Sequence, residues 1–221
     1  MKKFTFLAGL FILLSSCSTI KIVDSWKSDD VSVVKNEHII VIARTDDQVA
    51  RQRFEQEIAN RLRSAGFNAT ESYKKFPAIS VNKKETPEEV KKYIQILKNE
   101  GFEAVVLTVL RDKTKKIVTS ETGSYVSGGY YPSYYGPYYG GFGRYYGSVY
   151  SPYGYGYGGT YVPVETRTYT SETYVLETVV YNLKKADGKQ LVAVVTAEVI
   201  DPKSSSKLAP EYADKVLKSL K

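Results

Sequence analysis

Cysteine, histidine, tryptophan and methionine each occur only once among the 221 residues of this chain. A single cysteine excludes an internal disulfide and a zinc site built from cysteines, and a single histidine excludes a multi-histidine metal cluster. These scarcities remove many classes of enzyme, so we predict no catalytic residues, no metal and no cofactor. Tyrosine and glycine are abundant instead, with 20 and 16 residues. The charge balance is mildly basic, with 31 Lys and Arg against 24 Asp and Glu.

Residues 1–16 have the organisation of a secretory signal peptide. Met1-Lys2-Lys3 is a basic start, and residues 4–14 form an uncharged, mostly apolar run. A membrane-spanning helix needs about 20 apolar residues, so this run is too short for an ordinary anchor. Leu14-Ser15-Ser16-Cys17 resembles the bacterial lipobox, in which the chain is cut before the cysteine and the cysteine is acylated, with palmitate among the acyl chains.

We therefore predict cleavage after Ser16 and anchoring to a lipid bilayer through acylated Cys17. The alternative is an ordinary signal peptide that happens to end near a cysteine. Ser18 rather than Asp follows the cysteine, which by resemblance to enterobacterial sorting favours the outer membrane. No acidic run follows, which favours the side facing the periplasm. We expect no nucleic-acid partner in that compartment.

The chain after the anchor predicts an α/β domain. Residues 17–37 comprise the lipidated N-terminus and a short tether or edge strand. Residues 38–122 form a β-α-β-α-β half, because apolar β-branched runs alternate with amphipathic stretches that begin at capping residues and end at glycines. The predicted elements are a strand at 38–44, a helix at 45–65 capped by Thr45, a strand at 67–73, a helix at 86–100 that begins with a capping box of Thr86 and Glu89, and a strand at 104–110.

Residues 162–221 complete the same domain with a β-hairpin and a C-terminal helix. Residues 164–183 and 191–200 are rich in Val, Thr and Tyr, and Asp187-Gly188 between them is a hairpin turn signal. An apolar stripe predicts the closing helix over 208–220. The fold class is therefore α/β with a mixed sheet in two or three layers, interrupted by an insert.

The insert, residues 123–161, holds 14 of the 20 Tyr and 12 of the 16 Gly. Three prolines and very few aliphatic side chains predict a disordered segment without a regular helix or strand. It is a neutral insertion, an adhesive or self-associating segment, or a glycan-binding loop, since tyrosine faces stack on aromatic rings, cations and sugars. Its candidate contact residues are Tyr130, Tyr131, Tyr134, Tyr135, Tyr138, Tyr139, Arg144, Tyr145 and Tyr146.

Asp46 and Asp47 follow the first buried strand, where α/β folds often bind ligands. Paired carboxylates there could hold a cation or perform acid–base chemistry, but favourable placement at a helix N-terminus also explains them. His38 begins that strand and has no nucleophile motif to serve, so we interpret it as a boundary residue.

Trp26, the strand–helix pair at 38–66, Gly101-Phe102-Glu103-Ala104-Val105-Val106 and the stretch Leu176 to Val192 resemble a family of uncharacterised bacterial lipoproteins. Ala193 stands where that resemblance leads us to expect an aromatic residue. The layout is also similar to envelope lipoproteins with an anticodon-binding-like α/β domain, including the curli-secretion type. The resemblance implies an envelope location and no established activity.

The sequence thus predicts an envelope lipoprotein that acts as a non-enzymatic interaction or structural protein. Its expected partners are the bilayer, through Cys17, and a protein partner or a second copy, through residues 123–161. The alternative is a module that binds glycan, peptidoglycan or a small ligand. A hydrolase is the hypothesis that the sequence favours least.

Overall fold

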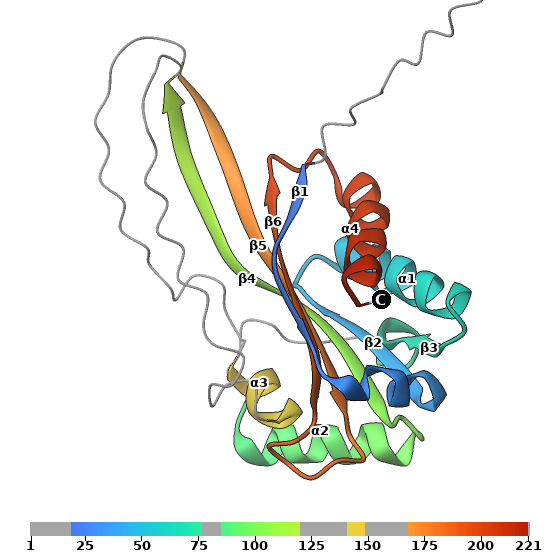
Figure 1. Ribbon diagram of the computed structural model, residues 1–221. Coiled ribbons are helices and arrows are strands. Elements are labelled where there is room, and N and C mark those ends of the chain that lie inside the picture. The colour runs from blue at the N-terminus through green and yellow to red at the C-terminus, as the bar shows by residue number, and fades with distance from the viewer. Residues whose placement is uncertain (1–18, 77–84, 120–140, 149–167, 221) are drawn as a thin grey trace, which may run out of the picture.

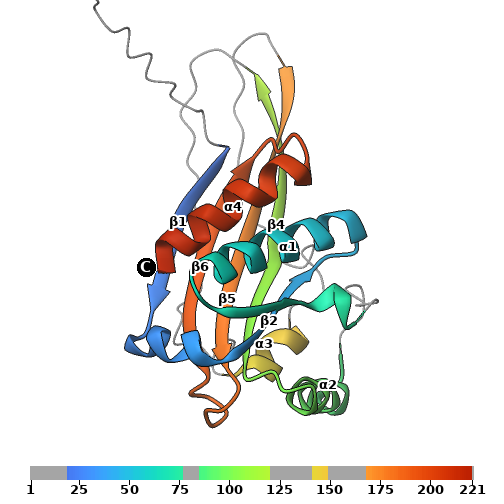
Figure 2. The ribbon, with the colours of Figure 1, turned by 90° about the vertical axis from the view of Figure 1, so that its right-hand side faces the viewer.

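The computed structural model describes residues 19–76, 85–119, 141–148 and 168–220. They form a six-stranded mixed sheet in the order β1-β6-β5-β4-β2-β3. Helices α1 and α4 cover one face of the sheet, and α2 and α3 lie on the other (Figures 1 and 2). The predicted α/β class with a mixed sheet is confirmed. No helix within the described ranges is long and apolar enough to cross a membrane.

The parallel half follows the predicted β-α-β-α-β order. Strand β2 pairs in parallel with β3 on one side and β4 on the other. Gly66 and Gly101, which end the two helical segments, both have positive φ angles, as predicted for helix stops. The elements are β2 (His38–Arg44), α1 (Gln48–Ser64), β3 (Asn68–Glu71), the 3-10 turn η2 (Ser72–Lys74), α2 (Pro87–Asn99) and β4 (Ala104–Thr119).

The two helix starts differ in how well the sequence predicts them. Thr86 and Glu89 form the predicted capping box of α2. The prediction that Thr45 caps α1 is wrong, because Asp47 is the N-cap residue and its Oδ1 accepts hydrogen bonds from the amides of Val49 and Ala50. Thr and Asp both favour the N-cap position, so the sequence alone does not distinguish Thr45 from Asp47 as the cap of α1.

The antiparallel half adds three strands and two further helical segments. The prediction of an edge strand near the mature N-terminus is confirmed, since β1 pairs with β6 at the sheet edge. The residues that follow β1 form a 3-10 helix. The elements are β1 (Ile20–Lys27), η1 (Asp29–Asn36), β5 (Thr168–Asn182), β6 (Leu191–Ile200) and α4 (Ser205–Leu220).

Strands β4 and β5 extend beyond the rest of the sheet as a two-stranded arm (Figure 1). They pair from Ala104 and Asn182 to Thr119 and Thr168, whereas β6 reaches only Thr173 of β5. Lys115 and Lys113 reach Glu172 across the arm at 2.9 and 3.4 Å. The arm therefore carries both ends of the segment that includes the Tyr- and Gly-rich insert.

Part of that insert is folded, so the prediction of a segment without helix or strand is wrong for residues 142–148. These residues form helix α3 (Phe142–Ser148), and Phe142, Tyr145 and Tyr146 are buried in the core between the sheet and α2. The aromatic rings of α3 provide apolar surface although aliphatic side chains are scarce in the insert. They are buried against side chains of the sheet and of α2. Residues 123–140 and 149–161 lie outside the described residues.

An apolar cavity lies between the sheet and the last turns of α1 and α4. Its volume is about 60 Å³, and Ala193, Leu62 and Leu217 are among the side chains that line it. The small Ala193 side chain therefore leaves unfilled space between the sheet and the helices α1 and α4.

Filling this cavity is expected to stabilise the protein. Ala193→Val should raise the free energy of unfolding by about 1 kcal/mol, given roughly 24 cal/mol for each Å³ of cavity. Ala197, on the same strand and also fully buried, does not line the cavity. Ala197→Val should therefore lower stability by about 1–3 kcal/mol through overpacking. Urea unfolding of both variants tests this, and equal effects would contradict it.

Candidate functional site

The exposed loop after β2 carries Asp46 and Asp47, the predicted ligand-binding pair. Asp47 is engaged as the N-cap of α1 and both side chains lie at the surface. Within the described residues, no group of three or more His, Cys, Asp and Glu side chains could hold a metal ion. The arrangement gives Asp47 a structural task and does not bring the pair together with further chemistry-bearing groups.

The carboxyl ends of the parallel strands β2 and β3 meet beside α1 and η2. Two side chains of α1, Arg51 and Glu55, lie there and contact β2 and η2. Both are fully buried, and they form an ion pair with Nε and Oε1 3.1 Å apart. The sequence reasoning missed this pair, whose only signal was a charged i, i+4 pair on an otherwise apolar helix stripe.

Every side of the Glu55 carboxylate is occupied by a donor. Oε1 accepts from the amide of Ala43 at 3.1 Å and from the hydroxyl of Ser72 at 2.7 Å, and Oε2 accepts from the amide of Tyr73 at 2.7 Å. Burial raises the pKa of Glu55, although these hydrogen bonds and the charge of Arg51 act in the opposite direction. The ion pair thus joins β2, α1 and η2.

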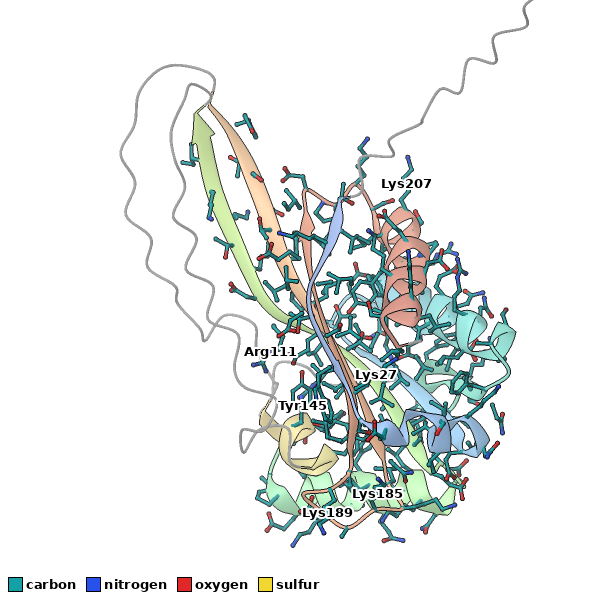
Figure 3. All side chains as sticks on the ribbon, viewed as in Figure 1. Lys27, Arg111, Tyr145, Lys185, Lys189 and Lys207 are labelled. Atoms are coloured by element: carbon teal, nitrogen blue, oxygen red, sulfur yellow. The ribbon has the colours of Figure 1, made fainter. Side chains whose placement is uncertain are left out.

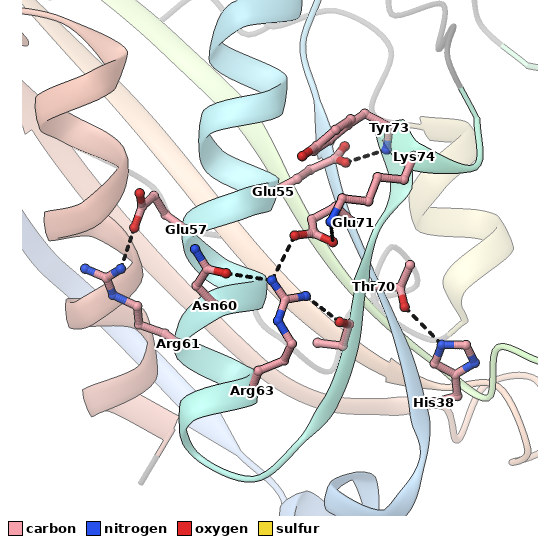
Figure 4. A network of polar contacts seen from close by, with 11 residues as sticks. His38, Glu55, Glu57, Asn60, Arg61, Arg63, Thr70, Glu71, Tyr73 and Lys74 are labelled. Atoms are coloured by element: carbon pink, nitrogen blue, oxygen red, sulfur yellow. Dashed lines mark hydrogen bonds and ion pairs between the residues drawn. The ribbon is translucent and has the colours of Figure 1, made fainter.

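His38 lies at the opposite end of β2 in a structural setting. Its Nε2 is 3.1 Å from the Thr70 hydroxyl, and its ring lies 4.4 Å from that of Phe102 (Figure 4). These contacts tie β2 to β3 and to the start of β4. The interpretation of His38 as a boundary residue fits these contacts.

Glu71 at the end of β3 is the centre of a second polar cluster (Figure 4). Its carboxylate lies 2.9 Å from Arg63 and 2.8 Å from Lys74. Burial of this carboxyl opposes its ionisation, but the hydrogen bonds from Arg63 and Lys74 outweigh burial and lower the pKa of Glu71 to about 2. The contacts clamp the edge strand to α1.

The lowered pKa predicts acid sensitivity. Ionised Glu71 stabilises the fold above its ordinary pKa near 4.5, and this stabilisation is lost as the pH falls from there through about 2. Because Arg63 and Lys74 are partly exposed, we expect a contribution of about 1–2 kcal/mol at pH 7. Glu71→Gln should cost that much in urea unfolding at pH 7 and less than about 0.5 kcal/mol at pH 2, where Glu71 is about half protonated. Glu100→Gln, which removes an exposed pair with Lys75, should change little at either pH, and an equal loss there would refute the assignment.

Helix α3 docks on the other face of the sheet through Tyr146. The buried Arg44 side chain donates to the Tyr146 carbonyl and lies 4.7 Å above the Tyr146 ring. The Tyr93 ring of α2 stacks on Tyr146, with centroids 5.0 Å apart and planes inclined by 17°. Burial lowers the pKa of Arg44. An arginine from the end of β2 and a tyrosine from α2 thus both contact one residue of the insert.

Tyr145 anchors the same helix at a second point. Its hydroxyl donates to the buried carboxylate of Glu177 on β5, and Arg111 of β4 lies 3.6 Å from that carboxylate and 5.8 Å from the Tyr145 ring centroid. Figure 3 shows Arg111 and Tyr145 on the side of the sheet that carries α3. The Phe142 amide donates to the Gln190 side chain at 3.1 Å. Docking therefore uses polar contacts as well as apolar burial.

Two glycines of the insert allow this close approach. A Cβ atom added at Gly143 would lie 2.8 Å from Cδ1 of Ile94 and 3.1 Å from Cγ1 of Val90 on α2. A Cβ atom at Gly141 would lie 1.9 Å from Oδ1 of Asp187. Both distances are shorter than non-bonded contacts, so glycine at these positions serves packing.

These observations correct the predicted roles of Tyr145 and Tyr146. We expected them to be surface contact residues, but both are buried and hold the insert to the domain. Phe142, Tyr145 and Tyr146 stand at i, i+3 and i+4, which is the helical spacing that could have revealed a short helix. Arg144 lies in α3 with its side chain outside the described part. The other candidates, Cys17, Tyr130, Tyr131, Tyr134, Tyr135, Tyr138 and Tyr139, lie outside the described residues.

Solved structures with a similar layout are known. The PelC dodecamer from Paraburkholderia phytofirmans matches with a TM-score of 0.42 and 11% identity, over 91% of this chain and 95% of that chain. Lipoprotein GNA1162 from Neisseria meningitidis matches with a TM-score of 0.37 and 10% identity, over 82% of this chain and 96% of that chain. No protein-family model and no curated protein matches the chain. Likenesses at this level assign no activity.

Proposed function

We propose that this protein is a non-enzymatic lipoprotein of the bacterial envelope that binds a protein partner through its Tyr- and Gly-rich insert. Acylated Cys17 anchors it to the outer membrane on the periplasmic side. The observation that carries the proposal is the docking of α3. It divides the long connection between β4 and β5 into two parts. Residues 120–140 join β4 to α3, and residues 149–167 join α3 to β5; we call them the first and second loops.

Fixing the middle of a long segment lowers the conformational entropy that binding must overcome. The composition of the loops suits recognition as well. Tyrosine provides a large, rigid contact surface with a hydroxyl, and glycine and serine provide adaptable backbone, which is the combination found in antibody binding loops. The insert has very few charged residues, so contacts would depend on stacking and hydrogen bonds.

The buried and capping charged groups support a binding role over catalysis. Arg51 and Glu55 are fully buried and pair with each other. Asp47, the other residue considered for chemistry, caps α1. The two loops are therefore the part of the chain to test first.

The test places a photo-cross-linking amino acid at Tyr134 in the first loop or Tyr155 in the second, in cells. Val33 is the matched control, since it is an exposed residue of η1 far from the insert in sequence. We expect specific cross-linked products from the loop positions only. Cross-linked products from all three positions alike, or from none, would contradict the proposal. Retention of the protein on isolated peptidoglycan through the same loops would show that the partner is a glycan and not a protein.

A second variant keeps the fold while removing the loops. Deleting all of 123–161 would remove Phe142, Tyr145 and Tyr146 from the core. Replacing residues 123–138 and 151–161 with Gly-Ser sequence of equal length leaves α3 in place. This variant should lose the cross-linked partner and keep the stability of the native chain in urea.

The anchor gives a separate prediction. Cys17→Ala removes the only thiol of the chain. Because each buried CH₂ of an acyl chain contributes about 0.8 kcal/mol, the variant should leave the membrane fraction and lose fatty-acid labelling. Unchanged membrane retention with unchanged labelling would refute lipidation at this residue.

A further inference from the structure

The surface that receives α3 is a complete docking site made by the rest of the domain. We call it the α3 groove. Ile94 and Val90 of α2 approach Gly143, and the Tyr93 ring stacks on Tyr146. From the sheet, Arg44 and Glu177 bind the backbone of Tyr146 and the hydroxyl of Tyr145. All these contacts join α3 to residues far from it in sequence.

The chain on both sides of α3 is long compared with the domain. Residues 120–140 and 149–167 join α3 to the ends of β4 and β5, which gives about 20 residues on each side. A chain of that length spans at most about 60–70 Å. A folded domain of about 160 residues has a radius of gyration of about 15 Å. These connections are therefore long enough to reach the groove of an adjacent copy.

We propose that the α3 groove also accepts α3 from a second copy of this chain, so that neighbouring copies exchange the helix. The contacts within and between chains are identical, so the two arrangements differ mainly in the entropy of the connecting residues. A membrane anchor confines the copies to a surface and raises their local concentration, which favours exchange. The inference rests on the proposed function for this anchoring.

The groove selects its own helix over other segments. Glycine at the position of Gly143 fits as the structure stands, whereas a Cβ atom there requires the end of the Ile94 side chain to rotate. Two tyrosines must follow at the spacing of Tyr145 and Tyr146 to meet the Glu177 carboxylate and the Tyr93 ring. The same Gly-x-Tyr-Tyr spacing occurs at 128–131 and 136–139, but only in α3 does a phenylalanine precede the glycine. The buried Phe142 ring lies 5.5 Å from that of Tyr146 and 5.9 Å from that of Tyr181, and a second copy carries the same combination.

Engineered cysteines test the exchange in the full-length, membrane-bound chain. Cγ1 of Val90 lies 3.1 Å from a Cβ atom placed at Gly143, so cysteines at these two positions are within disulfide reach. Cδ1 of Ile94 is the end of a flexible side chain and can rotate to make room. One copy carries Val90→Cys and the other, with a different tag, carries Gly143→Cys, and the two are co-expressed and oxidised.

We expect a mixed disulfide between the two tags, increasing with expression level. Val33→Cys in place of Val90→Cys should form none, since Val33 lies on exposed η1. Tyr145→Ala in the copy that donates α3 should reduce the mixed disulfide at least about tenfold.

A chain that carries both cysteines provides the geometric control. An intrachain disulfide in that chain without any mixed disulfide would overturn the exchange, and no disulfide in either would overturn the docking geometry on which it rests. Loop cross-links to another protein in the absence of the mixed disulfide would leave the proposed function standing and refute only the exchange.

Discussion

Glu55→Gln is expected to lower the free energy of unfolding by about 3–5 kcal/mol, because it leaves the buried Arg51 without its charged partner. The Glu55 carboxylate accepts four hydrogen bonds, from Arg51, Ala43, Ser72 and Tyr73. A glutamine side chain has only one acceptor oxygen. Its NH₂ group is a donor and would face the donors that bind the second carboxylate oxygen of Glu55. The loss should appear as a lower midpoint in urea with an unchanged slope.

Two variants separate the buried pair from a general charge effect. Glu57→Gln, on the same helix, breaks a partly exposed pair with Arg61 and should cost less than about 1 kcal/mol. The double variant Arg51→Met with Glu55→Leu removes both charges together and should be more stable than Glu55→Gln alone. If Glu55→Gln and Glu57→Gln destabilise equally, the assigned role of the buried pair is wrong.

Tyr145→Ala is expected to release α3 from the domain. The Tyr145 ring is fully buried, its hydroxyl binds Glu177, and its ring lies 6.2 Å from that of Tyr181. Truncating a buried aromatic side chain costs about 3–5 kcal/mol. Since α3 has only seven residues, it has little stability of its own and should detach while the sheet stays folded.

The release can be measured at Val90, which is buried on α2 next to Gly143. In a Val90→Cys background, the rate of thiol labelling should rise at least about 100-fold with Tyr145→Ala. Tyr145→Phe keeps the ring and loses only the hydroxyl, so its effect should be about tenfold. Equal labelling rates in all three proteins would show that α3 does not cover Val90.

The regular elements were predictable because local and tertiary preferences agree in them. The apolar run at His38–Arg44 became the central parallel strand, and the capping box at Thr86 and Glu89 starts α2. The Asp187-Gly188 signal lies in the connection between β5 and β6, with Gly188 at positive φ. In each case the same residues favour the local conformation and bury the right face.

The candidate site was less predictable because its contacts are long-range. Tyr145 and Tyr146 stand in a repeat of Tyr and Gly, so their composition suggested exposure. Their burial depends on Glu177 and Arg44, which are far away in sequence. The i, i+4 spacing of Arg51 and Glu55 is equally typical of an exposed helical ion pair, and their burial depends on contacts with β2 and η2.

Amide hydrogen exchange of residues 142–148 in the membrane-bound native chain tests the central claim, that the insert is held to the domain by its own helix. An isolated helix of this length would give almost no protection, so protection here reports docking. The account predicts that the Tyr145 amide, which donates to the Gly141 carbonyl, exchanges at least about 100-fold more slowly than in an unstructured peptide. Exchange at the rate of an unstructured peptide throughout 142–148 would contradict it.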